Sequence, residues 1–261
     1  MRIVRVARPA GPAFGVVRDG HVVLIEPHPF TSFTLTDQVA PLDRVRLLAP
    51  VIPSKVLCVG LNYADHAAEL GVDLPAEPLI FDKLATAVVG PGADIRLPAL
   101  SREVHHEAEV AVVIGRVARR VGPGEALGAV AGYTCANDVT ARDLQRRDGQ
   151  WTRAKGFDTF CPLGPWIDTD ADPADGLAVR CRVNGELRQD GTTADFVFGV
   201  AELVSYASSF TTLLPGDVLL TGTPAGVGEL RDGDTVEVGV AGIGTLSNPA
   251  VSDAGHGGRA G

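Results

Sequence analysis

The chain has 261 residues, of which 45% are hydrophobic and 21% charged, and its formal net charge at pH 7 is −9. This length allows a large domain with a small appendage, and the composition excludes a chain that is disordered throughout. The acidic balance argues against nucleic acid and anionic membranes as partners, because their phosphate groups would be repelled.

Other features of the sequence favour a cytoplasmic protein. The first residues carry charge and proline too early for a signal peptide, and no apolar run approaches the roughly 18 residues of a membrane helix. The cysteines form no C-x-x-C pair and are expected to be buried free thiols in a reducing compartment; they are Cys58, Cys135, Cys161 and Cys181.

Residues 1–50 are predicted to form a small β-rich subdomain. Short apolar segments alternate there with turns and are typical of an antiparallel meander; they lie at residues 2–7, 13–18 and 21–25. Residues 36–40 are predicted to form a short helix. Two prolines then mark the boundary to a larger domain, residues 51–251.

A predicted strand at residues 54–60 is followed by a predicted helix at residues 61–71, which ends in glycine. His66 and Glu69 are three residues apart and are therefore neighbours on one face of this helix. A carboxylate beside an imidazole fixes its tautomer and raises its basicity, as a general base requires. The alternative is an exposed surface pair that contributes only a few tenths of a kcal/mol.

Two glutamates at the start of an apolar strand point most strongly to chemistry. Glu107 and Glu109 alternate along the strand and therefore face one side, and no polar residue interrupts residues 110–114. Adjacent buried carboxylates need a counter-charge, and Asp138, at the end of the next predicted strand, offers a third oxygen ligand. Carboxylate ligation selects Mg²⁺, Mn²⁺ or Ca²⁺ over Zn²⁺. The alternative is a solvated strand end.

A helix is predicted at residues 139–147. If Asp138 binds a metal, Arg142 and Gln145 lie on the same helical face and supply a guanidinium and an amide to a carboxylate-bearing substrate. The alternative is a structural role in which Arg142 pairs with Asp138 or Glu109.

The sequence leaves two alternative roles for each of two lysines. Lys155 lies in a stretch predicted to be irregular, residues 151–165, and either points at an anionic site or snorkels at the surface. Lys83 ends a predicted strand at residues 79–83 and either contacts substrate or is solvated.

Towards the C-terminus, a predicted strand at residues 217–221 opens into a glycine-rich segment, residues 222–228. Backbone amides of such a segment can approach a ligand closely, although the Gly-Lys-Ser/Thr ending of a P-loop is missing. An amphipathic helix is predicted at residues 198–210, and the tail, residues 252–261, is expected to be disordered.

Together these segments resemble the fumarylacetoacetate hydrolase family from about residue 50 to about residue 250. The motifs that carry the resemblance are Gly60-Leu61-Asn62-Tyr63 with His66 and Glu69, His106-Glu107-Ala108-Glu109, Gly132-Tyr133, Asn137-Asp138-Val139-Thr140-Ala141-Arg142-Asp143, and Gly222-Thr223-Pro224-Ala225-Gly226-Val227-Gly228. The resemblance implies a mainly β (α+β) fold, a mixed β-sandwich roll, and a homodimer.

The resemblance also implies roles for individual residues. The metal, Mg²⁺ or Mn²⁺, would be held by Glu107, Glu109 and Asp138. His66 with Glu69 is similar to the family's water-activating dyad, and Lys155 resembles the lysine that stabilises an oxyanion or enolate. The substrate-contacting positions would be Arg142, Gln145 and Thr223, with Lys83 a weaker candidate. Leu84 follows Lys83 where relatives often have proline, a departure that bears on the shape of the Lys83 loop and on substrate choice.

By this resemblance the chain is expected to be a divalent-metal-dependent hydrolase. Its substrate would be a small 2-oxo acid, a 3-acylpyruvate or fumarylpyruvate, whose C–C bond is cleaved through an enolate. The same chemistry supports an isomerase of 2-hydroxyhepta-2,4-diene-1,7-dioate or 5-carboxymethyl-2-hydroxymuconate type, or an oxaloacetate decarboxylase. The non-enzyme alternative is a metal-binding scaffold, against which the intact dyad, lysine and acidic ligands argue.

Overall fold

The computed structural model describes residues 1–253. Of the tail that was expected to be disordered, Ser252 is the last residue of a strand, and residues 254–261 lie outside the described residues. None of the helices in the described part has both the length and the hydropathy that a membrane crossing requires. The four cysteines are free and buried, as expected.

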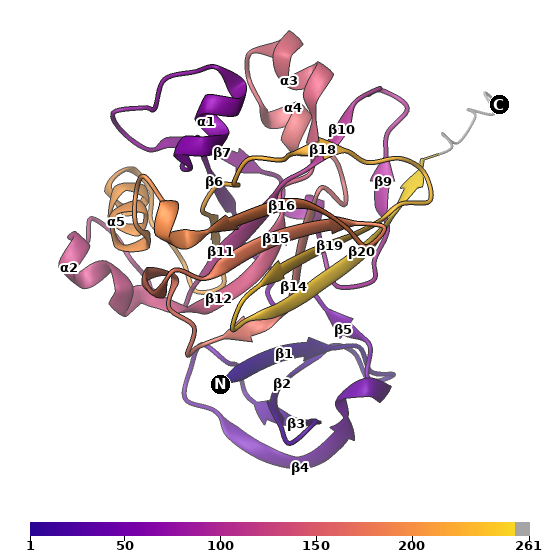
Figure 1. The fold of residues 1–261 in the computed structure, drawn as a ribbon. Helices are drawn as coiled ribbons and strands as arrows, with labels where there is room; N and C mark the ends of the chain where they lie inside the picture. The colour runs from indigo at the N-terminus through magenta and orange to yellow at the C-terminus, as the bar shows by residue number, and fades with distance from the viewer. Residues whose placement is uncertain (254–261) are drawn as a thin grey trace, which may run out of the picture.

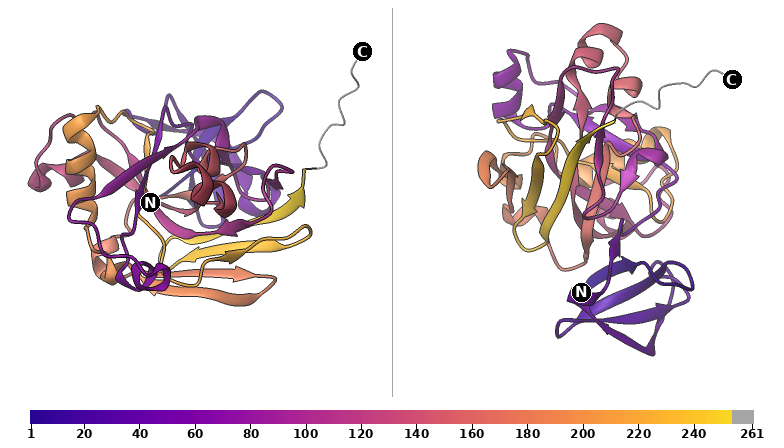
Figure 2. Two further views of the ribbon diagram at one scale, coloured as in Figure 1. Left: turned by 90° about the horizontal axis from the view of Figure 1, so that it is seen from above. Right: turned by 90° about the vertical axis from the view of Figure 1, so that its right-hand side faces the viewer.

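The N-terminal strands form an antiparallel meander that projects from the main body as a lobe (Figures 1 and 2). Its strands are β1 (Arg2–Val6), β2 (Ala13–Arg18), β3 (His21–Glu26), β4 (Thr34–Pro41) and β5 (Leu47–Leu48), with a 3₁₀ turn at Leu42–Arg44. The prediction of a helix at residues 36–40 is wrong, because this segment pairs with β3 and so continues the meander. The β-branched residues Thr36 and Val39 suit that extended backbone.

The lobe is continuous with the main sheet because β1 pairs with β14. From β1 the sheet continues through β14 (Cys161–Asp168), β12 (Val130–Asn137), β11 (Ala108–Ile114), β17 (Val218–Leu220), β6 (Val56–Gly60) and β7 (Leu79–Lys83), with β8 (Val88–Val89) paired to β14. Residues 110–114 of β11 are fully buried, as their apolar run predicts for a strand covered on both faces.

A second sheet packs against β11, β12 and β14 and completes a β-sandwich. Its strands, in spatial order, are β16 (Glu186–Thr192), β15 (Ala178–Val183), β19 (Thr235–Val240), β20 (Gly244–Ser252) and β9 (Ile95–Leu97). A small third sheet contains β13 (Thr140–Ala141), β10 (Val104–His106) and β18 (Gly228–Glu229). The expected mainly β fold is confirmed.

The helices lie around the sandwich, and α1, α3 and α4 gather at the end opposite the N-terminal lobe (Figure 1). They are α1 (Ala64–Leu70), α2 (Pro123–Ala126), α3 (Arg142–Asp148), α4 (Thr152–Lys155) and α5 (Val200–Phe210), with further 3₁₀ turns at Ala85–Ala87, Leu127–Ala129, Pro173–Asp175 and Thr193–Asp195. The segment predicted to be irregular therefore contains α4.

Helix α1 begins three residues later than predicted, because the backbone conformation of Leu61 and the contacts of Asn62 with other segments hold the preceding residues outside the helix. Leu61 has a positive φ of 58°, and the buried amide of Asn62 donates to the carbonyls of Phe198 and Thr221. Gly71 ends the helix in the left-handed conformation, as its glycine predicts.

A buried carboxylate joins the parallel strands β6 and β17. Asp217, 1% exposed, accepts hydrogen bonds from the backbone N–H groups of Ser54, Lys55 and Leu214, and its Oδ2 lies 2.5 Å from Nζ of Lys55. Burial acts to raise the pKa of this carboxyl, but the Lys55 ammonium and the Ser54 hydroxyl outweigh it and hold the pKa below its ordinary value. The charged carboxylate therefore stabilises the start of both strands.

We predict that Asp217→Asn lowers the free energy of unfolding by about 1.5–3 kcal/mol at pH 7, since charge-assisted hydrogen bonds are lost. Because the folded-state pKa is lowered, the contribution of Asp217 is fully present above the unfolded pKa of about 3.9 and is lost as the pH falls below it. Urea unfolding at several pH values should show the difference between the two proteins shrinking below about pH 4. Exposed Asp175→Asn is the control; a difference independent of pH would contradict the assignment.

Candidate metal centre and active site

Three acidic side chains from neighbouring strands meet at the end of the sandwich below α1 and α3. Glu107 lies between β10 and β11, Glu109 lies in β11, and Asp138 follows β12. The antiparallel register pairs Ala108 with Asn137, and the N–H of Asp138 donates to the carbonyl of Glu107 at 2.9 Å. One carboxylate oxygen of each residue lies within 4.8 Å of those of the other two. The structure thus brings together the predicted ligands, and the alternative of a solvated strand end is wrong, because all three are buried.

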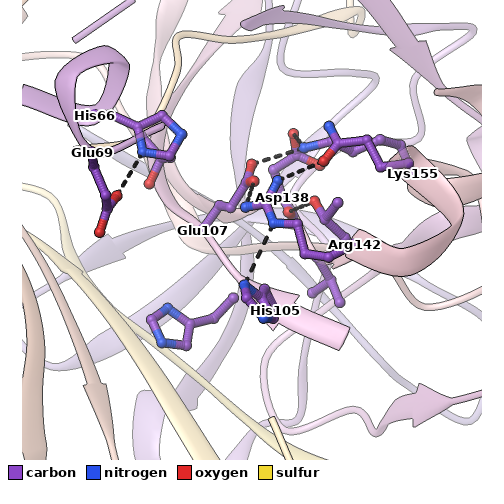
Figure 3. A network of polar contacts seen from close by, with 12 residues as sticks. His66, Glu69, His105, Glu107, Asp138, Arg142 and Lys155 are labelled. Carbon is purple, nitrogen blue, oxygen red and sulfur yellow. Dashed lines mark hydrogen bonds and ion pairs between the residues drawn. The ribbon is translucent and has the colours of Figure 1, made fainter. Parts of the chain in front are cut away.

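Cationic side chains contact two of these three carboxylates. Nζ of Lys155 lies 2.8 Å from Glu107 and 2.7 Å from Asp138, Nζ of Lys83 lies 2.5 Å from Asp138, and the Arg142 guanidinium pairs with Glu107 (Figure 3). Burial acts to raise the pKa of Glu107, but Arg142 and Lys155 hold it well below the ordinary range. Burial acts to lower the pKa of Lys155, but Asp138 and Glu107 raise it. Lys155 is therefore a permanent cation at neutral pH.

Glu109 differs from the other two acids. Among the described residues it has no cation partner, and its recorded hydrogen bond is the one that the N–H of Gly222 donates to Oε2 at 2.6 Å. Burial, followed by the charges of Asp138 and Glu107, raises the pKa of Glu109 well above its ordinary value. A divalent cation fits this site, because the donors are carboxylate oxygens and one of them lacks a counter-charge. The residues that would hold the ion are Glu107, Glu109 and Asp138.

His66 and Glu69 form the expected pair on α1. Nδ1 of His66 lies 3.0 Å from Oε2 of Glu69, and the imidazole is buried. Because a carboxylate only accepts, Nδ1 carries the hydrogen and Nε2 is left as a proton acceptor. The other oxygen of Glu69 accepts from the N–H of Gly226 at 3.0 Å, and Asp65 accepts from the N–H of Ala225. The alternative of an exposed surface pair is wrong for the imidazole.

A cavity of about 340 Å³ lies between His66 and two of the acids, Glu107 and Glu109. Its polar lining contains His66, Glu107, Glu109, Lys155, Arg142, Gln145, Arg146 and Thr223, and its apolar lining contains Val59, Leu61, Val72, Leu79, Phe81 and Trp151. The structure therefore brings together most of the residues proposed for catalysis and substrate contact. Two of them do not line this cavity. Glu69 lies behind His66, to which it is hydrogen-bonded, and the ammonium of Lys83 contacts Asp138 and the carbonyl of Val139.

Arg142 has a fixed place in the cluster. Its guanidinium donates to Glu107, to Oε1 of Gln145 at 2.8 Å and to Nδ1 of His105 at 3.5 Å. The expected alternative partners, Asp138 and Glu109, are not the acids that it contacts. Five guanidinium N–H groups with three in use leave two for a carboxylate in the cavity.

Sequence reasoning missed several residues around the site. Gln189, on β16, bonds to β11 and to the loop after β17, while Asp65 fixes α1 to the same loop. His105, against Arg142, has a pKa lowered by burial and by that guanidinium. A lone glutamine or histidine carries no signal in the sequence, because only the fold brings its partners near.

A family model described as "Fumarylacetoacetate (FAA) hydrolase C-terminal" matches residues 55–251. The chain belongs to the fumarylacetoacetate hydrolase family. Residues 1–50 match a second family model, described as "Rv2993c-like, N-terminal". The family expected from the motifs is confirmed.

Relatives cover most of the chain. Protein Rv2993c of Mycobacterium tuberculosis is 52% identical in an alignment of length 264 that covers 96% of this chain and 98% of that protein. The mitochondrial oxaloacetate tautomerase FAHD2B of Bos taurus is 48% identical in an alignment of length 226 that covers 82% of this chain and 72% of that protein. The structure of 2-hydroxyhepta-2,4-diene-1,7-dioate isomerase from Mycobacterium marinum is 49% identical with a TM-score of 0.91 and covers 98% of this chain and 100% of that one. These relatives are consistent with an enzyme.

We predict that Glu109→Gln weakens metal binding without destabilising the metal-free protein. A raised folded-state pKa means that folding disfavours the charged Glu109 at neutral pH, so the neutral amide should leave the metal-free free energy of unfolding unchanged or raise it by about 1 kcal/mol. This penalty on the wild type disappears as the pH falls below about 4.3. Mn²⁺ at 100 times its Kd should stabilise the wild type by about 2.7 kcal/mol, and the variant should gain much less.

Thermal unfolding with and without Mn²⁺, and calorimetric titration, measure both effects. Glu125→Gln, an exposed substitution of the same type on α2, is the matched control and should behave as the wild type. Equal Mn²⁺ affinity in Glu109→Gln and the wild type would rule out Glu109 as a ligand.

Proposed function

We propose that this protein is a divalent-metal-dependent tautomerase that interconverts the keto and enol forms of a small 2-oxo dicarboxylic acid of the oxaloacetate type. The observation that carries the proposal is the shared cavity, which is lined by a hydrogen-bonded imidazole, a buried ammonium and two carboxylates, Glu107 and Glu109, that cluster with Asp138. The 48% identity to an oxaloacetate tautomerase over 82% of the chain supports it.

In this proposal His66 moves the proton. For enolisation, Nε2 of His66 takes the hydrogen at C3, and the electron pair of that C–H bond forms the C2=C3 double bond. The C2 oxygen becomes an enolate oxygen, and its protonation gives the enol; the reverse steps return the keto form. The Glu69 carboxylate holds Nδ1 and stabilises the imidazolium that forms.

Lys155 holds a positive charge where the enolate oxygen develops. Two of its three N–H groups donate to Glu107 and Asp138, so one is left for an oxygen in the cavity. We assign Lys155 an electrostatic role, in which its charge stabilises the enolate oxygen. Arg142 and Gln145 bind a substrate carboxylate with their remaining N–H groups.

A divalent ion held by Glu107, Glu109 and Asp138 would supply Lewis-acid charge that favours the enolate. The burial of these acids away from bulk water would strengthen that effect. The proposed metal is Mg²⁺ or Mn²⁺, with Ca²⁺ as a further hard ion that oxygen ligands accept.

Hydrolytic cleavage of an acylpyruvate or fumarylpyruvate is the second candidate. The observation that favours it is the geometry of the His66–Glu69 pair, because Nε2 is equally suited to take a proton from water that attacks a distal carbonyl. Both candidates share the enolate, and they differ in whether a water molecule reaches the cavity. The resemblance to the isomerase from Mycobacterium marinum supports the shared proton-transfer step.

Three further expectations remain proposals. A division into a subdomain at residues 1–50 and a catalytic domain at residues 51–251 agrees with the separate family matches. Homodimer formation and a cytoplasmic location follow from the resemblance and the composition.

The proposed function is tested with enol oxaloacetate and acetylpyruvate in the presence of Mg²⁺ or Mn²⁺. Ultraviolet absorbance follows loss of the enol, while NMR identifies the products and the exchange of hydrogen at C3 in D₂O. We expect faster enol loss and C3 exchange with all carbon atoms retained. Pyruvate and acetate from acetylpyruvate would support the hydrolase instead, and pyruvate with CO₂ from oxaloacetate would indicate a decarboxylase.

We predict that His66→Ala lowers kcat for tautomerisation about 10²–10⁴-fold, because the proton acceptor is removed. Glu69→Gln should lower it less, since an amide can still orient the imidazole. Mn²⁺ affinity, measured by calorimetry, should change little in either variant because neither residue is an acidic ligand. Glu202→Gln, exposed on α5, is the control. A His66→Ala protein with wild-type kcat would exclude the imidazole as the base.

A further inference from the structure

Gln189 is a fully buried amide that connects three segments of the chain. Its Oε1 accepts from the N–H of Ala108 at 2.9 Å and from Nδ1 of His106 at 3.1 Å. Its Nε2 donates to the hydroxyl of Thr223 at 2.7 Å and to the carbonyl of Pro224 at 2.8 Å. One side chain therefore connects three segments: β16, the start of β11 next to the acidic cluster, and the glycine-rich loop at residues 222–228.

The partners of Gln189 determine which way its amide faces. The N–H of Ala108 only donates and the carbonyl of Pro224 only accepts, so oxygen must face the first and nitrogen the second. If the amide were rotated by 180°, its NH₂ group would face the N–H of Ala108 and its oxygen would face the carbonyl of Pro224, and neither pair could form a hydrogen bond. A hydrogen of the amide nitrogen therefore points at the Thr223 oxygen.

The Thr223 hydroxyl is then committed as well. It donates its hydrogen to the carbonyl of Ala108 at 2.9 Å, because that carbonyl only accepts, and it receives a hydrogen from Gln189. A threonine hydroxyl has one donor and two acceptor positions, so one acceptor position remains. Thr223 lines the cavity, so a hydrogen bond between its hydroxyl and a ligand there is one that Thr223 accepts.

The loop has little freedom to change this arrangement. A Cβ on Gly191 of β16 would lie 2.5 Å from the Cβ of Pro224, and a Cβ on Gly226 would lie 2.1 Å from the carbonyl oxygen of Arg188. The backbones of β16 and the loop therefore pack too closely for either glycine to be replaced without a shift. This close packing keeps Gln189 under Thr223.

We propose that Gln189 is a positioning residue that holds the Thr223 hydroxyl with its hydrogen on the carbonyl of Ala108. Thr223 is then a hydrogen-bond acceptor in the cavity, so that the site favours ligands that present a hydroxyl, such as the enol of a 2-oxo acid, over their keto forms. The inference rests on the proposed function only in taking a 2-oxo acid and its enol as the contents of the cavity. A donor threonine would favour the keto oxygen or a carboxylate, so the direction of this bond decides which tautomer is held more tightly.

Two acids of similar size test the proposal by binding alone. L-lactate carries a 2-hydroxyl that stands in for the enol hydroxyl, and pyruvate carries a 2-oxo group. Calorimetric titration of the Mn²⁺-loaded protein gives both Kd values. Thr223→Val should weaken lactate binding about 3- to 10-fold, the effect of one hydrogen bond, and should leave pyruvate binding within about twofold. Thr223→Ser, which keeps the hydroxyl, should retain the wild-type ratio of the two Kd values.

Gln189→Met tests the positioning role. It should shift the lactate-to-pyruvate ratio in the same direction as Thr223→Val, and Thr223→Val added to it should have little further effect. Val204→Ala, a buried truncation on α5, is the control for lost stability and should leave the ratio unchanged. If Gln189→Met does not fold, the Thr223 variants still decide the polarity of the hydroxyl.

The inference would be overturned if Thr223→Val weakened lactate and pyruvate binding equally, or weakened neither. It would also be overturned if the wild type bound neither acid. Discrimination between lactate and pyruvate in a protein without tautomerase activity would leave the inference standing and overturn only the proposed function.

Discussion

The structure depends on keeping three buried carboxylates together. Glu107, Glu109 and Asp138 repel one another, and each would resist desolvation if it were alone. Their compensation comes from separate parts of the chain: Lys83 at the end of β7, Arg142 at the start of α3, Lys155 at the end of α4, and the backbone of Gly222 after β17. Folding of the cluster therefore requires β7, β11, β12, β17 and both helices to be in place. Glu109 is left without a cationic partner among the described residues, and this is the charge that a bound cation would neutralise.

The glycine-rich loop connects the acidic cluster to the His66–Glu69 pair. Three of its backbone N–H groups donate to acidic side chains: Gly222 to Glu109, Ala225 to Asp65 and Gly226 to Glu69. Gly222 and Gly226 both have φ near +95°, with values of 95° and 96°, and a Cβ at either would collide with neighbouring atoms. Glycine is thus required for the conformation and for the close approach of the backbone to acidic groups. One loop of seven residues thereby positions a proposed ligand and the proposed dyad.

Much of the site could be predicted because it rests on local rules. Strand alternation puts Glu107 and Glu109 on one side, and helical spacing pairs His66 with Glu69. The roles of Gln189 and Lys83 could not be predicted, since their partners are distant in sequence and no periodicity links them. The prediction of a helix at residues 36–40 was wrong because pairing with β3 overrides the weak helical preference of this segment. Helix α4 has only four residues and cannot be recognised from a periodic pattern.

The Glu69 carboxylate has two attachments: Oε2 to the imidazole of His66 and Oε1 to the backbone of Gly226. Seating of α1 and orientation of the imidazole are therefore one event. Because His66 and Glu69 both belong to α1, any substitution that displaces the helix from the loop would shift the imidazole and break the Glu69–Gly226 bond together.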